Sequence, residues 1–170
     1  MSEEAARERA GSRKWYILSG LSGLVLGVVL TAVVVMTTMP GMMIVTRPSP
    51  LGFEETVTRL ESSIEEQGWV HSGTRNMNKS LSKHGTEFEP RVRLVALCHP
   101  DYAESVLSTD RYVSCLMPCK IAVWEGDDGG VYLSKMNTGL MGKMFGGNIA
   151  RVMGGSVAKD EHEILARVLE

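Results

Sequence analysis

The chain has 170 residues, a net charge of −2 and three cysteines. This near-neutral charge argues against nucleic-acid binding, which requires a basic surface. The sequence contains no GxGxxG or GxxxxGK[ST] phosphate loop and no Gly-x-Ser-x-Gly motif, so no nucleotide-dependent or hydrolytic activity is indicated. The sequence favours a protein without catalytic residues.

An uncharged segment over residues 15–39 is the strongest local signal. As a helix it is roughly 37 Å long, enough to cross a hydrocarbon core of about 30 Å. A cleaved signal peptide is the alternative, but residues 37–41 show no Ala-x-Ala cleavage pattern. The segment therefore predicts an uncleaved transmembrane helix over 15–39, with the lipid bilayer as its surroundings.

The charges on either side of this segment predict its direction. Four cations precede it, namely Arg7, Arg9, Arg13 and Lys14, whereas the next cation after it is Arg47. Positive charge is retained on the cytoplasmic side. We therefore expect a cytoplasmic tail over 1–14 and an extracytoplasmic domain over 40–170, which would be periplasmic in a bacterium.

Small residues recur every four positions within the predicted span, at Ser19, Gly23, Gly27 and Thr31. Such a stripe lets a second helix approach closely. Glycine is also simply frequent in membrane helices, which is the alternative explanation. The stripe predicts packing in a homodimer or against other subunits of a membrane complex.

The first half of the soluble part predicts strands around one long helix. A strand over 42–46 is bounded by prolines, and a helix from Phe53 to Gly68 carries an apolar stripe. Further strands are expected over 69–72 and 91–97. Between them, the polar residues 76–89 predict a loop with one helical turn.

The second half begins with a helix opened by Pro100. A strand over 112–117 and a hairpin of 120–124 with 131–134 follow, the hairpin having a Gly-Asp turn. Asn137 is placed to cap the next helix, and Asp160 with Glu163 form a capping box for the last. This order predicts an α+β domain with helices packed on an antiparallel sheet.

Several of these segments resemble the Domain of Unknown Function 302 family. They are VALCHP at 95–100, MPCKIAV at 117–123, VYLS at 131–134 and the helix over 137–145. The resemblance covers about 53–169 and is most specific at Met117-Pro118-Cys119. It implies a small fold similar to half of the TATA-binding protein, of β-α-β(4)-α order and dimeric in several members, and it implies no activity. The membrane anchor lies outside it.

The cysteines are the best candidates for chemistry. Cys98 is expected at a strand end beside His99, just before a helix whose N-terminus would favour a thiolate. The alternative is that Cys98 is simply a small buried residue. Cys115 and Cys119 could pair only if Pro118 bends the chain, and either one could instead pair with Cys98.

Two hypotheses follow from these observations. The first is a tethered, non-catalytic binding domain or accessory subunit of a membrane complex. The second is a redox or soft-metal module that uses the thiols and binds copper or haem, since sulfur ligands suit Cu(I). Its candidate ligands are Cys98, His99, Cys115, Met117 and Cys119. In an extended strand, Cys115, Met117 and Cys119 would share one face, although at a spacing too wide for one ion without a bend.

Overall fold

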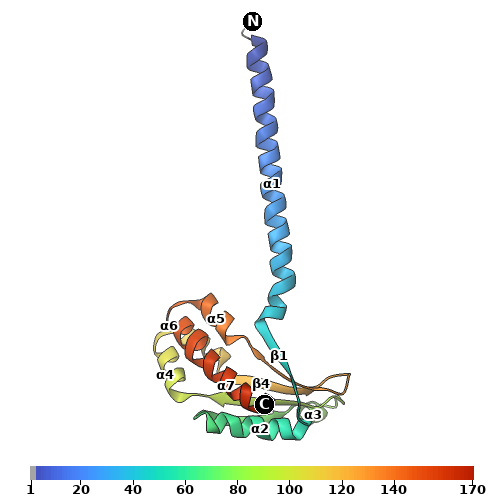
Figure 1. Ribbon diagram of the computed structural model, residues 1–170, viewed down its shortest axis with the longest axis vertical. Coiled ribbons are helices and arrows are strands. Elements are labelled where there is room, and N and C mark those ends of the chain that lie inside the picture. The colour runs from blue at the N-terminus through green and yellow to red at the C-terminus, as the bar shows by residue number, and fades with distance from the viewer. Residues whose placement is uncertain (1–2) are drawn as a thin grey trace. The chain divides into compact units, whose positions relative to one another are not determined.

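The computed structural model describes residues 3–170, apart from the side chains of residues 3–14, 16–19 and 40. The chain divides into two compact units, Met1–Gly41 and Met42–Glu170 (Figure 1). The described residues of the first unit belong to one long helix, α1 (Glu3–Met43). Among the described residues, the segment Gly20–Met39 has a mean hydropathy of 2.3 and is long and apolar enough to span a membrane. By length and composition it suits either a membrane anchor or a signal sequence.

The second unit is an α+β domain built on a five-stranded antiparallel sheet of order β1-β5-β4-β3-β2. This confirms the predicted fold class. The strands are β1 (Ile44–Ser49), β2 (Val70–Asn76), β3 (Val92–Cys98), β4 (Cys119–Glu125) and β5 (Val131–Met136). The helical segments are α2 (Phe53–Glu66), α3 (Met77–Ser82), α4 (Pro100–Thr109), η1 (Arg111–Leu116), α5 (Thr138–Phe145), α6 (Gly147–Arg151), the π-helical η2 (Val152–Val157) and α7 (Ala158–Leu169).

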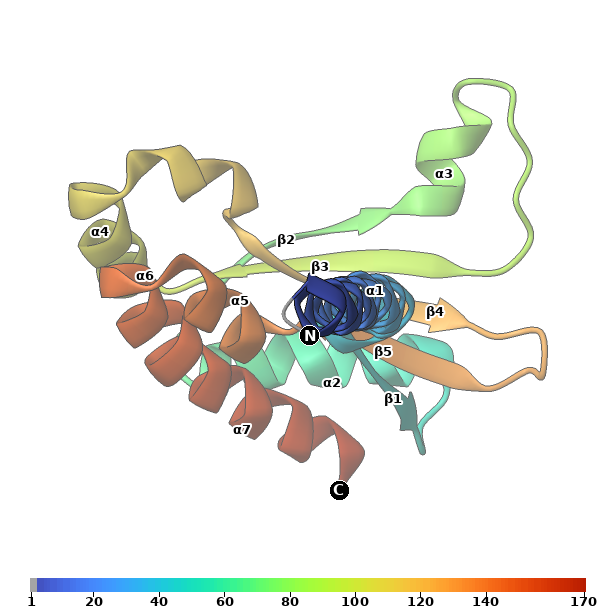
Figure 2. The ribbon, with the colours of Figure 1, turned by 90° about the horizontal axis from the view of Figure 1, so that it is seen from above.

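Helices α2 and α7 pack side by side over one face of the sheet (Figure 2). The apolar stripe of α2 supplies Leu60 and Ile64, which are fully buried against Val95 and Ile121 in the sheet and Ile164 of α7. Burial of such side chains is the main favourable term in folding. The core therefore lies between the sheet and this helical layer.

Local signals end and begin several elements as predicted. Gly68, at a φ of +81°, follows the end of α2, and Pro100 is the first residue of α4. The Asn137 side chain accepts a hydrogen bond from the Leu140 amide at 3.1 Å and so caps α5. The polar region predicted as a loop contains the single short helix α3, capped by Asn76. Figure 2 shows this segment at the far end of the domain from α4 and α6.

Three details of the prediction are wrong. Residues 111–116 form the 3-10 helix η1 rather than a strand, because β3 and β5 already occupy both sides of β4. Pro48 lies within β1 instead of bounding it, which an edge strand tolerates. Asp160 does not cap a helix, since Gly147–Leu169 is helical throughout and Asp160 lies inside it.

Candidate functional site

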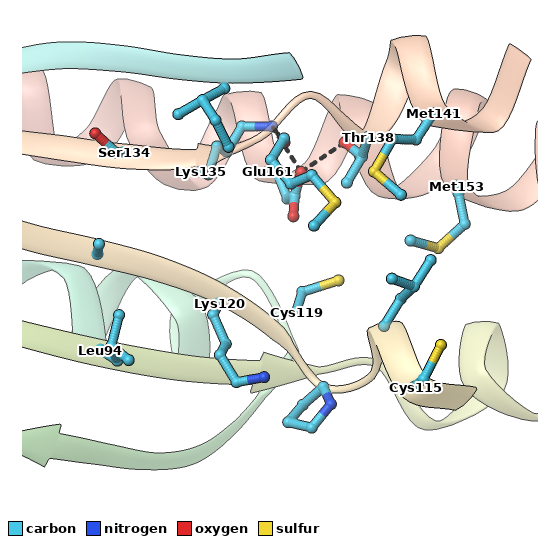
Figure 3. A pocket seen from close by; sticks show the side chains of 15 residues that line it. Leu94, Cys115, Cys119, Lys120, Ser134, Lys135, Thr138, Met141, Met153 and Glu161 are labelled. Atoms are coloured by element: carbon cyan, nitrogen blue, oxygen red, sulfur yellow. Dashed lines mark hydrogen bonds and ion pairs between the residues drawn. The ribbon is translucent and has the colours of Figure 1, made fainter. Parts of the chain in front are cut away.

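A cavity of about 320 Å³ lies at the end of the sheet where β4 begins and β5 ends (Figure 3). The two strands pair only from Ile121 with Lys135 onward, so Cys119 on β4 and Met136 on β5 extend past the last pair. We refer to this space as the Cys119 cavity. Its wall is mostly apolar and consists of Ile44, Leu94, Cys115, Leu116, Pro118, Cys119, Lys120, Ala122, Ser134, Lys135, Met136, Thr138, Met141, Met153 and Glu161.

The cavity reaches both faces of the sheet around this end. Leu94, Ala122 and Ser134 are direct partners on neighbouring strands and share one face. Lys135 is the partner of Ile121, a core residue, and so points to the face that the helices cover. Adjacent residues of a strand point to opposite faces. The cavity therefore connects the helical layer with the uncovered face of the sheet.

A buried ion pair lies in the wall of the cavity. Lys135 Nζ lies 2.7 Å from Glu161 Oε2, and the two side chains are 9% and 2% exposed. The hydroxyl of Thr138 donates to the same carboxylate oxygen at 2.7 Å. Two donors and an opposite charge compensate the burial of the carboxylate, which would otherwise be costly. The contact also joins β5 to α7 across the cavity.

The Cys119 thiol lies opposite this ion pair (Figure 3). Burial raises the pKa of Cys119 to about 12, and the negative charge of Glu161 acts in the same direction. Because the thiolate is the nucleophile, a thiol held in the protonated form is a poor catalyst. Figure 3 also shows the sulfur atoms of Cys119, Met141 and Met153 directed into the same space. The cavity thus presents soft, apolar surface rather than an activated group.

This environment predicts different reactivity for the two cavity cysteines. Cys115 is exposed, whereas Cys119 has a pKa raised from 9.0 to about 12. At neutral pH we expect N-ethylmaleimide to modify Cys119 roughly a hundredfold to a thousandfold more slowly than Cys115. Timed alkylation followed by fragmentation mass spectrometry measures both sites in one molecule. In urea, where the fold is lost, the two cysteines should react at equal rates, which is the control. Equal rates in the folded protein would contradict the buried position of Cys119.

A second cluster of side chains lies beside the cavity. The rings of His99 and Tyr102 stack at 4.0 Å, and Trp69 meets both edge to face. Trp69 Nε1 and the Tyr102 hydroxyl each donate to Asp160 Oδ2 at 3.2 Å. Burial raises the pKa of Tyr102, and the negative charge of Asp160 adds to this, so the phenol keeps its proton. Asp160 therefore fixes aromatic packing, a role that the predicted capping box did not suggest.

The structure divides the predicted ligand set. Cys98, His99, Met117 and Cys119 line a hollow of about 20 Å³ beside Tyr102, whereas Cys115 lies on η1. A space of that size holds about one water molecule. The proposed strand face of Cys115, Met117 and Cys119 does not exist, because Cys115 is helical.

All three cysteines are free thiols. Among the described residues, no three His, Cys, Asp or Glu side chains lie close enough together to hold a metal ion. Methionine sulfur also binds Cu(I), so copper or haem binding stays a prediction.

Sequence reasoning found Cys119 but missed its surroundings. Lys135, Thr138 and Met141 come from the end of one strand and the helix after it, whereas Met153 and Glu161 come later in the chain. None of the five belongs to a motif. One signal was available for Lys135. It is the only charged residue of β5. Alternation along this strand places it on the same face as Leu133, which points into the core.

The small-residue stripe lies on α1. The Ser19 side chain falls outside the described residues, and Cβ atoms built on Gly23 and Gly27 would meet nothing within 4 Å. The Thr31 hydroxyl donates to the Gly27 carbonyl at 2.8 Å, within the helix itself. Helix packing along this stripe therefore stays a prediction.

Comparison with known proteins supports the resemblance noted in the sequence. The crystal structure of the uncharacterized conserved protein DUF302 from Bacillus stearothermophilus matches with a TM-score of 0.67 and 22% sequence identity. The match covers 75% of this chain and 98% of that one, so the two share a fold. None of the curated proteins compared with the chain matches it. The family model "Domain of unknown function DUF302" matches residues 45–170, and the chain therefore belongs to the DUF302 family.

Proposed function

We propose that this protein is a non-catalytic binding domain, held outside the cytoplasm by one transmembrane helix, and that it binds a small apolar molecule in the Cys119 cavity. The supporting observation is a largely apolar cavity of about 320 Å³. Sites for small molecules typically measure roughly 300–1,000 Å³ and combine apolar walls with a few polar groups. The raised pKa of Cys119 argues against a nucleophilic reaction in this space.

The position of the cavity along the chain suits an apolar ligand. Ile44, in its wall, is 50% exposed and follows the end of the apolar segment, Met39, by five residues. Five residues span at most about 18 Å even when fully extended. A helix anchored in a bilayer would therefore hold the start of β1 near the membrane surface. Apolar molecules partition out of water into the bilayer, so the start of β1 would lie close to a concentrated supply of them.

Ligand binding is expected to protect Cys119 from alkylation. With the full chain in lipid nanodiscs, octanol or its isomer heptyl methyl ether should slow N-ethylmaleimide modification of Cys119. At a free concentration ten times the dissociation constant, the rate should fall about tenfold, following the factor 1 + [L]/Kd. Cys98, a free thiol that does not line the cavity, serves as the internal control, because its rate should stay constant. If neither molecule changes the Cys119 rate, the cavity is not a binding site for small apolar molecules.

The topology is expected to be N-terminus inside, as the flanking charges predict. A membrane-impermeant maleimide added to intact spheroplasts should modify the exposed Cys115. A single-cysteine variant, Cys98→Ser with Cys119→Ser, makes the readout specific. Modification only after lysis would reverse the proposed orientation.

A further inference from the structure

We propose that the ligand of the Cys119 cavity carries a hydroxyl group that donates a hydrogen bond to the free carboxylate oxygen of Glu161. This inference rests on the proposed binding function and specifies the chemical class of the ligand as a neutral apolar alcohol. It depends on the geometry of the ion pair, on the charges that face the cavity and on the residues of its wall.

The first observation concerns the two oxygens of Glu161. Oε2 accepts both hydrogen bonds, from Lys135 and Thr138, at 2.7 Å each. Oε1 has no hydrogen-bond partner among the described residues. Among the described residues, the one fully buried side-chain nitrogen or oxygen that lacks a hydrogen-bond partner is His99 Nδ1. Glu161 Oε1 also lacks a partner, so it is accessible rather than fully buried. Figure 3 shows it directed into the cavity. A side chain that is 2% exposed thus presents one free acceptor to the cavity.

The second observation concerns charge. Lys135 already compensates the charge of Glu161 at 2.7 Å. The other charged residue of the wall, Lys120, is exposed, so water and salt screen its charge. A cationic ligand would meet the ammonium group, and an anionic ligand would meet the carboxylate, each in surroundings where charges are poorly screened. A neutral ligand avoids both penalties. A carboxylate can only accept, so the ligand must supply the donor.

A hydroxyl group fits this position better than other neutral donors. Lys135 donates to Glu161 and, at 3.4 Å, to the Met136 carbonyl, which leaves its third N–H without a partner in the described structure. A hydroxyl oxygen combines one donor with acceptor lone pairs, so one atom can serve both residues of the ion pair. The rest of the wall, including Met141, Met153 and Ile44, would contact an apolar chain.

Two isomers provide the test, because octanol and heptyl methyl ether contain the same atoms but only octanol has a donor. Protection of Cys119 from N-ethylmaleimide is measured with the full chain in nanodiscs, against the free aqueous concentration of each compound. A hydrogen bond to a charged group predicts that octanol protects at about tenfold to hundredfold lower concentration than the ether. Octanoate and octylammonium should both protect more weakly than octanol.

Variants assign the preference to Glu161. Because Glu161→Gln alone leaves Lys135 buried without its partner and keeps an acceptor oxygen, the double variant Lys135→Met with Glu161→Leu is measured beside it. The preference for octanol should disappear in the double variant, while protection by the ether remains. Glu163→Gln, in the same helix and 42% exposed, is the matched control and should keep the preference.

The outcomes separate this inference from the proposed function. Equal protection by octanol and the ether in the unsubstituted protein would overturn the hydroxyl contact and leave the binding function standing. A preference for octanol that persists in the double variant would place the donor contact elsewhere and also overturn the inference. No protection by any compound would overturn both.

Discussion

Glu161→Ala is expected to lower the free energy of unfolding by about 3–5 kcal/mol, because it leaves the Lys135 ammonium buried without a counter-charge. Lys135 is 9% exposed and lies 2.7 Å from the carboxylate. The same change removes the acceptor of the buried Thr138 hydroxyl. Urea unfolding of the full chain in detergent micelles, followed by the fluorescence of the buried Trp69, measures the loss.

Two further variants make this result specific. Lys135→Met combined with Glu161→Leu removes both charges and should recover most of the lost stability, since apolar replacements of buried pairs are often neutral or stabilising. Lys159→Ala breaks the exposed pair with Glu163, whose side chains are 76% and 42% exposed, and should have little effect. If Glu161→Ala behaved like Lys159→Ala, the ion pair would not be buried in solution.

Gly142→Ala is expected to separate α5 from η2 and to cost about 1–3 kcal/mol through overpacking. A Cβ on Gly142 would clash with the Gly154 backbone nitrogen and lie 2.6 Å from its Cα. Neither atom can move without shifting η2, because both belong to the backbone. Since Met141 and Met153 line the Cys119 cavity on these two elements, alkylation of Cys119 should also become faster.

Gly139→Ala, one turn earlier in α5, is the matched control. A Cβ there would meet its nearest neighbours, Asn137 Oδ1 and Ala158 Cβ, at 3.5 and 3.8 Å, which is ordinary contact. Replacing a helical glycine by alanine should then stabilise the protein by about 0.5–1 kcal/mol. Equal urea midpoints for the two alanine variants would contradict the close approach of α5 and η2.

Much of the fold was predictable because its signals are local. The apolar stripe of α2, the glycine-rich turn between β4 and β5, the cap at Asn137 and the first helical residue Pro100 each act within a few residues. Hydrophobic period and turn chemistry are properties of neighbouring residues, so they can be read without knowing the rest of the molecule. The same reasoning predicted an apolar segment over 15–39, and Gly20–Met39 is the described part that is long and apolar enough to span a membrane.

The errors occur where distant parts of the chain compete. The segment Arg111–Leu116 has a strand-like composition, but β4, the strand that follows it, is already paired on both sides, and the open edges of the sheet belong to β1 and β2. Asp160 and Glu163 have capping-box spacing, yet α6, η2 and α7 continue into one another. The Asp160 carboxylate instead accepts hydrogen bonds from Trp69 and Tyr102, which are far from it in sequence.

The candidate site shows the same division. The sequence by itself determined an apolar N-terminal segment, an antiparallel α+β domain and the position of Cys119 next to the strand predicted over 120–124. Tertiary structure alone decided that Cys119 faces Lys135, Glu161 and two methionines across a cavity. It also decided that Cys115 lines this cavity whereas Met117 lines the small hollow beside Tyr102. Periodicity and capping depend on contacts within one or two turns of chain. A cavity and a buried ion pair depend on which elements pack together, and that is set by the whole domain.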